Sequence, residues 1–246
     1  ISHLAPEATG KALGDWLTAN CPEIASFNVV KGFLNICLSS DYWRNALQQI
    51  CAAENYGQLP STGKTVMVEF SSPNTNKPLH LGHIRNNLLG ASVSNILQAA
   101  GNKVIKATLV NDRGIHICKS MLAWKQLFDG ATPASTGKKG DHLVGDCYVA
   151  FSNLLKQQSA ELMEQGMSKD EAEKAAPCMK EAHDMLVKWE QGDSEVRALW
   201  EMMNGWVFEG FDQTYKSLGI SFDKVDYEHD TYLLGKELVQ KGLDMG

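Results

Sequence analysis

Apolar residues in the first 60 positions of the chain follow two different periods. In KALGDWLTA and in DYWRNALQQICAA they recur at helical spacing, every third or fourth position. Between these segments, FNVVKGFLNICLS contains two short apolar and β-branched runs separated by Lys31-Gly32. The pattern predicts a small α/β N-terminal domain over residues 1–60, with two strands between two helices.

A cluster of turn-forming residues in NYGQLPSTGK, which includes Gly57, Pro60 and Gly63, predicts a linker after this domain. TVMVEF follows at once. Its continuous apolar and β-branched composition predicts a strand that is buried on both faces of a parallel sheet. We therefore expect a second domain over residues 61–246.

The segment LGHIRNNLLGASVSNILQAAG has the periodicity of a long helix. Its apolar positions repeat at Leu89, Val93, Ile96, Leu97 and Ala100. Gly101 follows, where a helix often ends. KVIKATLV then predicts another strand. A strand, a helix and a strand within about 45 residues form a βαβ unit, so the fold is expected to be α/β with a Rossmann-like parallel sheet and a right-handed crossover.

Residues from about 129 to 210 have a different composition. DGATPASTGKKGD is a polar loop, and amphipathic segments rich in Lys, Glu and Gln follow it. We expect a helical insertion in the second domain. Trp189, Trp200 and Trp206 recur along these segments and are expected to pack in its core.

Composition excludes several classes of protein. With 43% hydrophobic and 21% charged residues, the chain resembles ordinary globular proteins. No apolar run approaches the roughly 20 residues that span a bilayer, and the first residues show no signal peptide, so no membrane association is expected. The net charge of −6 argues against a generally basic nucleic-acid surface and leaves a local basic face open.

Six cysteines lie far apart and form no C-x-x-C pair. We expect them to be reduced and mostly buried, as in a cytoplasmic protein, and not to form a disulfide framework.

The loop before the predicted helix contains SSPNTNKPLHLGHIRN. Open α/β sheets bind ligands where a strand ends and a helix begins, and a helix N-terminus attracts phosphates. His80 and His83 are three positions apart and are expected to share one face of the first turn. Gly82 would let a base or a ribose approach the backbone, and Lys77 adds positive charge.

Two other interpretations of the histidines are a metal site and a packed structural pair. A zinc site of the H-E-x-x-H kind requires histidines four apart and an intervening glutamate, and this chain has neither. A pair of packed structural histidines stays open on spacing alone. The Walker A and G-x-G-x-x-G patterns are absent.

The whole string narrows these alternatives. VEFSSPNTNKPLHLGHIRN resembles the signature of class I aminoacyl-tRNA synthetases, whose HIGH motif appears here as His80-Leu81-Gly82-His83. EFSSPNTNKP is similar to the arginyl-tRNA synthetase form of that signature. NDRGIHICKSM, KGDHLVGDCYV and the stretch from Val196 to Val239 are similar to the same family, and KGFLNICLS resembles the end of its additional N-terminal domain. The resemblance therefore covers nearly all of the chain.

The resemblance implies an ATP-dependent ligase that activates L-arginine to arginyl-adenylate and transfers it to tRNA(Arg). It further implies Mg²⁺ with the ATP, and a monomer for the full-length enzyme. Two alternatives stay open: another HIGH-motif nucleotidyltransferase or class I synthetase, such as the cysteine enzyme, and a non-catalytic tRNA-binding module.

The resemblance also implies roles for individual residues. His80 and His83 would act on the ATP phosphates and the transition state, and Gly82 would line the nucleotide site. Lys77 would replace a lysine that this family often lacks in its KMSKS loop. The implied motif region comprises Pro73, Asn74, Lys77, Pro78, His80, Leu81, Gly82 and His83.

Arginine recognition is implied for a second set of residues. Glu69, at the end of the predicted strand, matches the glutamate that binds the guanidinium group, and Asn74 matches the asparagine that contacts the amino-acid backbone. Ser71 and Ser72 would contribute hydroxyl groups. Asp112 corresponds to the aspartate of the family string G-D-W-G-T-Q.

This chain departs from that string, because it has Arg113 and His116 where the family has tryptophan and glutamine. No role is carried over to either residue. His116 and Cys118 are not expected to form a catalytic pair, since no third residue orients them.

The sequence contains no KMSKS-like loop and no helical anticodon-binding domain. We expect the chain to be an N-terminal part of a longer enzyme and to be inactive alone. Lys11, Lys31 and Arg44 of the first domain are candidate contacts to tRNA phosphates, and a solvated surface would explain them equally well.

Overall fold

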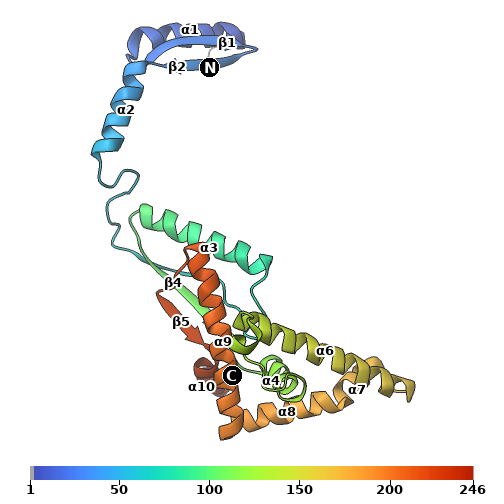
Figure 1. Ribbon diagram of the computed structural model, residues 1–246. Coiled ribbons are helices and arrows are strands. Elements are labelled where there is room, and N and C mark those ends of the chain that lie inside the picture. The colour runs from blue at the N-terminus through green and yellow to red at the C-terminus, as the bar shows by residue number, and fades with distance from the viewer. Residues whose placement is uncertain (1–2, 246) are drawn as a thin grey trace. The chain divides into compact units, whose positions relative to one another are not determined.

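A computed structural model describes residues 3–245 of the chain. The chain divides into two compact units, Ile1–Gln58 and Leu59–Gly246. Each unit has its own secondary structure (Figure 1).

The first unit is a β-hairpin covered by a helix. α1 (Pro6–Asn20) packs on the antiparallel strands β1 (Ile24–Val30) and β2 (Phe33–Leu38), and α2 (Ser40–Ala52) follows. Gly14 of α1 is buried against the ring of Phe27, and any side chain at this position would collide with that ring. Lys31 and Gly32 both have positive φ, at 51° and 80°, as a two-residue hairpin turn of this hand requires. The predicted strands and their break are confirmed.

The second unit contains a three-stranded parallel sheet with the order β3-β4-β5. α3 joins the first two strands, which confirms the predicted α/β class and βαβ unit (Figure 1). α3 ends just before Gly101, whose φ of 85° fits a helix stop, as predicted. The elements are β3 (Thr65–Glu69), α3 (Leu81–Ala99), β4 (Lys103–Val110) and β5 (Lys224–Tyr227).

Three of the apolar residues that repeat at helical spacing along α3 are largely exposed. Leu89, Val93 and Ile96 are 51%, 45% and 68% exposed. The buried residues of α3 are small or polar instead: Asn87, Gly90 and Ser94. The reason is the ring of Phe70, which lies so close to Gly90 that any side chain at that position would overlap it. Small residues therefore face the sheet, and the larger apolar ones point away.

β3 also differs from its prediction of burial on both faces. Val66 and Val68 are half-buried, whereas Met67, on the other face, is 56% exposed. Alternate side chains of a strand point to opposite faces, so helix packing on one face leaves the other open. Within the described residues, only one face of this strand is covered.

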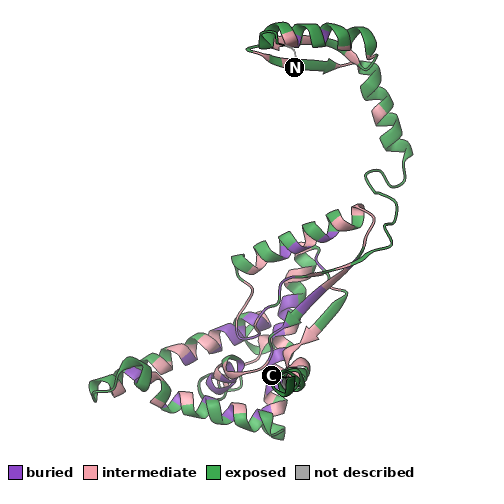
Figure 2. Ribbon diagram, turned by 180° about the vertical axis from the view of Figure 1, so that it is seen from behind, coloured by how far each residue is buried: buried purple, intermediate pink, exposed green. Residues whose placement is uncertain are grey.

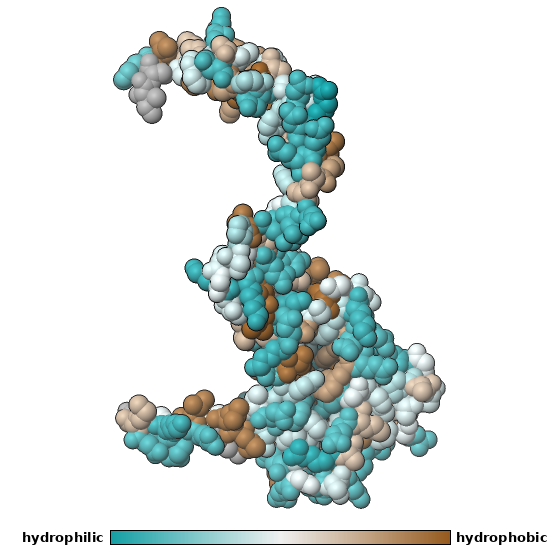
Figure 3. Space-filling model, turned by 90° about the vertical axis from the view of Figure 1, so that its left-hand side faces the viewer, coloured by the Kyte–Doolittle hydropathy of each residue, from teal (hydrophilic) through white to brown (hydrophobic). Residues whose placement is uncertain are grey.

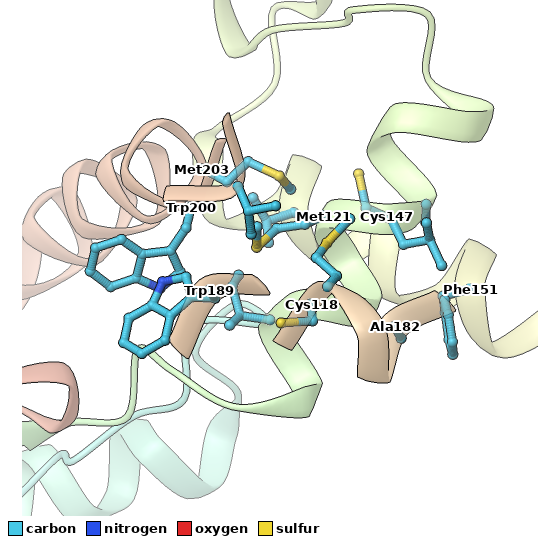
Figure 4. Close-up of a cluster of buried hydrophobic side chains, with 14 of the residues drawn as sticks. Cys118, Met121, Cys147, Phe151, Ala182, Trp189, Trp200 and Met203 are labelled. Atoms are coloured by element: carbon cyan, nitrogen blue, oxygen red, sulfur yellow. The ribbon is translucent and has the colours of Figure 1, made fainter. Parts of the chain in front are cut away.

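Most of the core lies in the helical segment between β4 and β5. Met121, Cys147, Phe151, Trp189 and Met203 are at most 1% exposed and belong to one cluster (Figure 4). Buried positions concentrate in these helices and in β4 (Figure 2). The helices are α4 (Ile115–Leu127), α5 (Pro133–Thr136), α6 (Gly140–Glu164), α7 (Lys169–Ala175), α8 (Pro177–Glu190) and α9 (Ser194–Leu218).

The three tryptophans of this segment pack as predicted. Trp189 and Trp200 are buried, with ring centroids 5.3 Å apart, and Trp206 packs against the same cluster. The expectation for the cysteines holds in part. All six are free, and Cys118, Cys147 and Cys178 are buried, but the other three lie at the surface or are half-buried.

The last helix, α10 (Glu228–Met245), presents an apolar surface (Figure 3). Leu234, Leu238 and Leu243 are between 61% and 71% exposed. Within residues 3–245, no helix combines the length and the apolar character that crossing a membrane requires.

Candidate active site

The loop between β3 and α3 is held against the end of β4. Asn111 donates its N–H to the carbonyl oxygen of Pro73 at 3.0 Å and accepts the N–H of Thr75 at 3.1 Å. On its other side the loop touches α6, where a side chain at Gly145 would lie 2.7 Å from Pro78. These contacts place the loop at the carboxyl end of the parallel sheet, where such sheets bind ligands.

His80 and His83 cap α3 with their own rings. The Nδ1 atom of His80 accepts the N–H of Gly82 at 3.1 Å, and the Nδ1 atom of His83 accepts the N–H of His80 at 3.2 Å. This is a capping box built from imidazoles. α3 begins at Leu81, so His80 is the cap residue and not, as predicted, part of the first turn.

The caps determine which ring nitrogens carry protons. A nitrogen that accepts a hydrogen bond is unprotonated, so the proton of each neutral ring is on Nε2. The two ring centroids are 4.0 Å apart, so both rings share one face as predicted. Within the described residues, no hydrogen bond uses either Nε2 atom, and both N–H groups are free to donate to a ligand.

Electrostatics keep His83 neutral. Partial burial lowers its pKa, and the neighbouring His80 and Lys77 lower it further. His83 is therefore a neutral hydrogen-bond donor, and half-buried Lys77 supplies the positive charge beside it.

Gly82 has a structural reason to be glycine. A Cβ atom there would lie 2.9 Å from Cε1 of His80, closer than such atoms approach. The missing side chain lets the His80 ring fold over the first turn of the helix. Contact of Gly82 with a nucleotide stays a prediction.

Glu69, Ser71 and Ser72 lie where the chain leaves β3 and the loop begins. Ser71 and Ser72 have positive φ, at 73° and 41°, a backbone conformation that serine adopts only when neighbours hold it. The N–H of Ser71 donates to Asn86 at 2.6 Å and that of Ser72 to Thr108 at 3.1 Å. The Ser72 hydroxyl then donates to the exposed carboxylate of Glu69 at 3.1 Å. The serine hydroxyls are thus already engaged, since that of Ser71 lies 2.7 Å from the hydroxyl of Tyr215.

Asn74 lines a cavity of about 220 Å³ at the ends of β3 and β4. Buried Asn76 lines it as well, and its Oδ1 atom has no partner among the described residues. The cavity also contains Glu228, which sequence reasoning missed. Glu228 directly follows β5, the third parallel strand, and recognising KVDY as a strand would have pointed to it.

Asp112 is not among the residues that line this cavity. Its side chain is fully buried, and both carboxylate oxygens contact His229: Oδ1 accepts the backbone N–H at 3.0 Å, and Oδ2 lies 2.5 Å from Nδ1. Burial raises the pKa of Asp112, and the hydrogen bonds from His229 oppose that rise. A direct contact of Asp112 with arginine stays a prediction.

Arg113 and His116 occupy well-defined positions. The guanidinium of Arg113 lies 3.9 Å from the ring centroid of Tyr232 and pairs with Glu190 at 2.6 Å. His116 is hydrogen-bonded to the hydroxyl of Tyr148 at 3.1 Å, and burial lowers its pKa.

Burial also disfavours Cys118 as a nucleophile. Burial raises the pKa of Cys118 to about 12, so it is a thiol at neutral pH and a poor nucleophile.

Comparison with known proteins identifies the family. The family described as tRNA synthetases class I (R), catalytic domain, matches residues 46–228, which include the loop, the sheet and the helical segment. The chain belongs to this family of class I tRNA synthetases.

Among curated proteins, the chain is similar to the arginine–tRNA ligases of Bacteroides thetaiotaomicron, with 59% identity, and Amoebophilus asiaticus, with 54%. The matches cover 100% and 99% of this chain but only 42% and 41% of those ligases, so the chain spans about two fifths of their length.

Solved structures agree in fold. An arginyl-tRNA synthetase from Thermus thermophilus superimposes with a TM-score of 0.60 at 25% identity, over 97% of this chain and 35% of its own. An arginyl-tRNA synthetase from Plasmodium falciparum superimposes with a TM-score of 0.50 at 17% identity. The match covers 94% of this chain and 38% of that one, and it supports the fold alone.

Proposed function

We propose that the chain provides the ATP- and arginine-binding part of an arginine–tRNA ligase. In the first step the carboxylate of arginine would attack the α-phosphorus of ATP, and pyrophosphate would leave. The terminal ribose hydroxyl of tRNA(Arg) would then take the arginyl group from the adenylate, and AMP would leave. One observation carries the proposal: two free Nε2–H donors lie beside Lys77 at the N-terminus of α3.

These groups suit the chemistry because the reaction needs no nucleophile from the protein. Negative charge develops on the phosphate oxygens as the bond to pyrophosphate breaks, and donors fixed in advance stabilise that charge. His80 and His83 are fixed by their capping bonds, so they need not reorganise. The helix N-terminus adds a positive dipole end at the same place.

Arginine selection would rest on carboxylates. The guanidinium group can donate two parallel hydrogen bonds to one carboxylate, which the ammonium group of lysine cannot copy. Glu69 is exposed and oriented by Ser72. Asn74 and Glu228 line one cavity, where an amide and a carboxylate suit the α-ammonium end of an amino acid.

Mg²⁺ would accompany the ATP. Within the described residues, no group of three or more His, Cys, Asp or Glu side chains is placed to hold a metal ion. The ion would be held chiefly through the phosphate oxygens of ATP and water, as Mg²⁺ commonly is at nucleotide sites. Since the proposed reaction serves translation, we expect a cytoplasmic enzyme, monomeric at full length.

A chimaera tests the proposal. The 246 residues replace the matching 42% of the Bacteroides thetaiotaomicron ligase, and arginine-dependent exchange of pyrophosphate into ATP is measured with tRNA present. We expect activity that falls about 100- to 1000-fold when His80 or His83 becomes alanine. His183→Ala, at an exposed position of α8, is the control and should leave the rate unchanged.

Other outcomes identify the alternatives. Exchange that depends on another amino acid would make the protein a different class I synthetase. A folded chimaera that binds tRNA and keeps its full rate without both histidines would make this chain a non-catalytic tRNA-binding module.

A further inference from the structure

We propose that Asp112 and His229 are positioning residues, which together fix the Glu228 carboxylate in the cavity beside Asn74. The inference rests on the proposed function, because it assigns Glu228 to the site that receives arginine. It gives Asp112 a role that does not require contact with the substrate.

Asp112 acts first on the backbone of α10. Its Oδ1 atom accepts the N–H of His229, the second residue of that helix. The first N–H groups of a helix have no partner within the helix, and a carboxylate there is also favoured by the helix dipole. A residue at the end of β4 therefore caps a helix that begins 116 positions later in the sequence.

The ring of His229 makes the second bond. Its Nδ1 atom lies 2.5 Å from Oδ2 of Asp112. The Asp112 side chain is 0% exposed, so loss of either bond would leave a buried carboxylate oxygen without a partner. Together, the two bonds from His229 fix how far the start of α10 lies from Asp112 and in which direction the helix runs.

Asp112 is itself held in place. Its backbone carbonyl oxygen accepts Nε1–H of Trp200 at 2.6 Å and Nδ2–H of Asn204 at 3.2 Å, both from α9. The Trp200 ring also lies edge-on to the His229 ring, with centroids 4.9 Å apart. The end of β4, the middle of α9 and the start of α10 are thus tied together at one residue.

Glu228 depends on this arrangement. It is the first residue of α10 and directly precedes His229. Within the described residues, no hydrogen bond or ion pair holds its carboxylate, although it lines the same cavity as Asn74 and Asn111. The carboxylate is therefore available to a cationic ligand, and the backbone at the start of the helix sets the position from which the side chain extends.

The test compares kinetic constants of variants in the chimaera. His229→Ala removes the ring donor and should raise KM for arginine about 10-fold, since a hydrogen bond to a charged group is lost, with KM for ATP unchanged. His229→Asn offers a side-chain N–H near the position of Nδ1 and should restore KM to within about threefold of the original. Should His229→Ala fail to fold, His229→Gln, whose donor lies farther along the side chain, takes its place.

A double mutant separates positioning from direct contact. Glu228→Gln should raise KM for arginine, and adding His229→Ala should raise it little further, because the second residue acts through the first. The inference would be overturned if the rise in KM for arginine in the double mutant equalled the product of the two single-mutant rises. Equal rises in KM for arginine and for ATP would overturn it as well. An active chimaera with no effect at His229 refutes the inference alone, whereas a chimaera without arginine-dependent activity refutes the proposed function.

A structural measurement on the 246-residue chain needs no activity. In a crystal structure of the Asp112→Ala variant, the start of α10 should shift and carry Glu228 out of the cavity. An unchanged Glu228 in that variant would contradict the inference.

Discussion

The Nδ1 atom of His83 accepts the backbone N–H of His80 at 3.2 Å, so one histidine of the motif orients the backbone that carries the other. This bond explains the spacing of the two residues. The cap position and the third residue of a helix are the pair that can bond reciprocally, and both rings then keep their Nε2–H groups for a ligand.

The pH dependence of His83 follows from its surroundings. Burial, and then His80 and Lys77, lower its pKa below 6.5. A histidine whose pKa is lowered by folding contributes stability that is complete above about pH 6.5 and is lost as the pH falls through the lowered pKa. Protonation at Nδ1 would also break the cap, so activity should fall over the same range.

An NMR titration of the ring protons of His83 in the 246-residue chain measures that pKa. His83→Asn is the control for the pH dependence of activity. The amide oxygen of asparagine can still accept the His80 N–H, but the side chain does not titrate. A pKa at or above 6.5 for His83 would contradict the prediction.

Gly82→Ala should reduce activity but leave stability nearly unchanged. Alanine favours a helix by about 1 kcal/mol over glycine, but its Cβ would displace the His80 ring, which lies 2.9 Å from that position. We expect exchange activity of the chimaera to fall about 100-fold, as for loss of one catalytic donor, with little change in thermal unfolding. Gly205→Ala on α9 is the matched control, since a Cβ there meets nothing within 4 Å and activity should be retained.

Glu69→Gln should weaken arginine binding selectively. The substitution keeps the shape of the side chain and removes its charge. Hydrogen bonds to charged groups contribute about 1.5–3 kcal/mol, so KM for arginine should rise about 10- to 100-fold while KM for ATP stays constant. Glu201→Gln, at an exposed position of α9, should change neither constant, and equal effects at both positions would exclude a specific role for Glu69.

Trp189→Ala should destabilise the second unit strongly. Trp189 is 1% exposed, packs against Trp200 and has the Arg197 guanidinium 3.6 Å from its ring centroid. Loss of a buried tryptophan typically reduces the free energy of unfolding by about 3–5 kcal/mol, which urea unfolding of the chain would measure. Val187→Ala on the same helix is the control, because Val187 is 49% exposed, and about 0.5 kcal/mol or less is expected. Similar losses for both variants would argue against a specific packing role for Trp189.

Much of the fold could be predicted from local pattern. The hairpin break at Lys31-Gly32, the helix stop at Gly101 and the strand before the histidine loop each depend on residues close together in sequence. The histidine pair was recognisable for a similar reason, since its resemblance to the HIGH motif rests on four consecutive residues, His80-Leu81-Gly82-His83. Local chemistry is enough to determine such features.

Other features depended on distant partners. Periodicity identified α3 as a helix but could not show which of its residues face the sheet, because that depends on the ring of Phe70, which requires a glycine at position 90. The contacts of Gly82 and Asp112 likewise depend on where the His80 ring and His229 lie in the fold. Steric overlap and burial depend on residues that are distant in the sequence, so they produce no periodic pattern that a single sequence could reveal.

By itself, the sequence predicted the elements up to β4, the parallel βαβ unit and the histidine motif, because hydrophobic period, turn residues and short motifs act within a few positions. Only the tertiary structure decided which face of α3 packs, that Asp112 binds His229, and that Glu228 lies in the cavity beside Asn74. The Asp112 and His229 side chains are 117 residues apart in the chain. Contacts of that kind form only when the sheet and the long helices bring distant segments together.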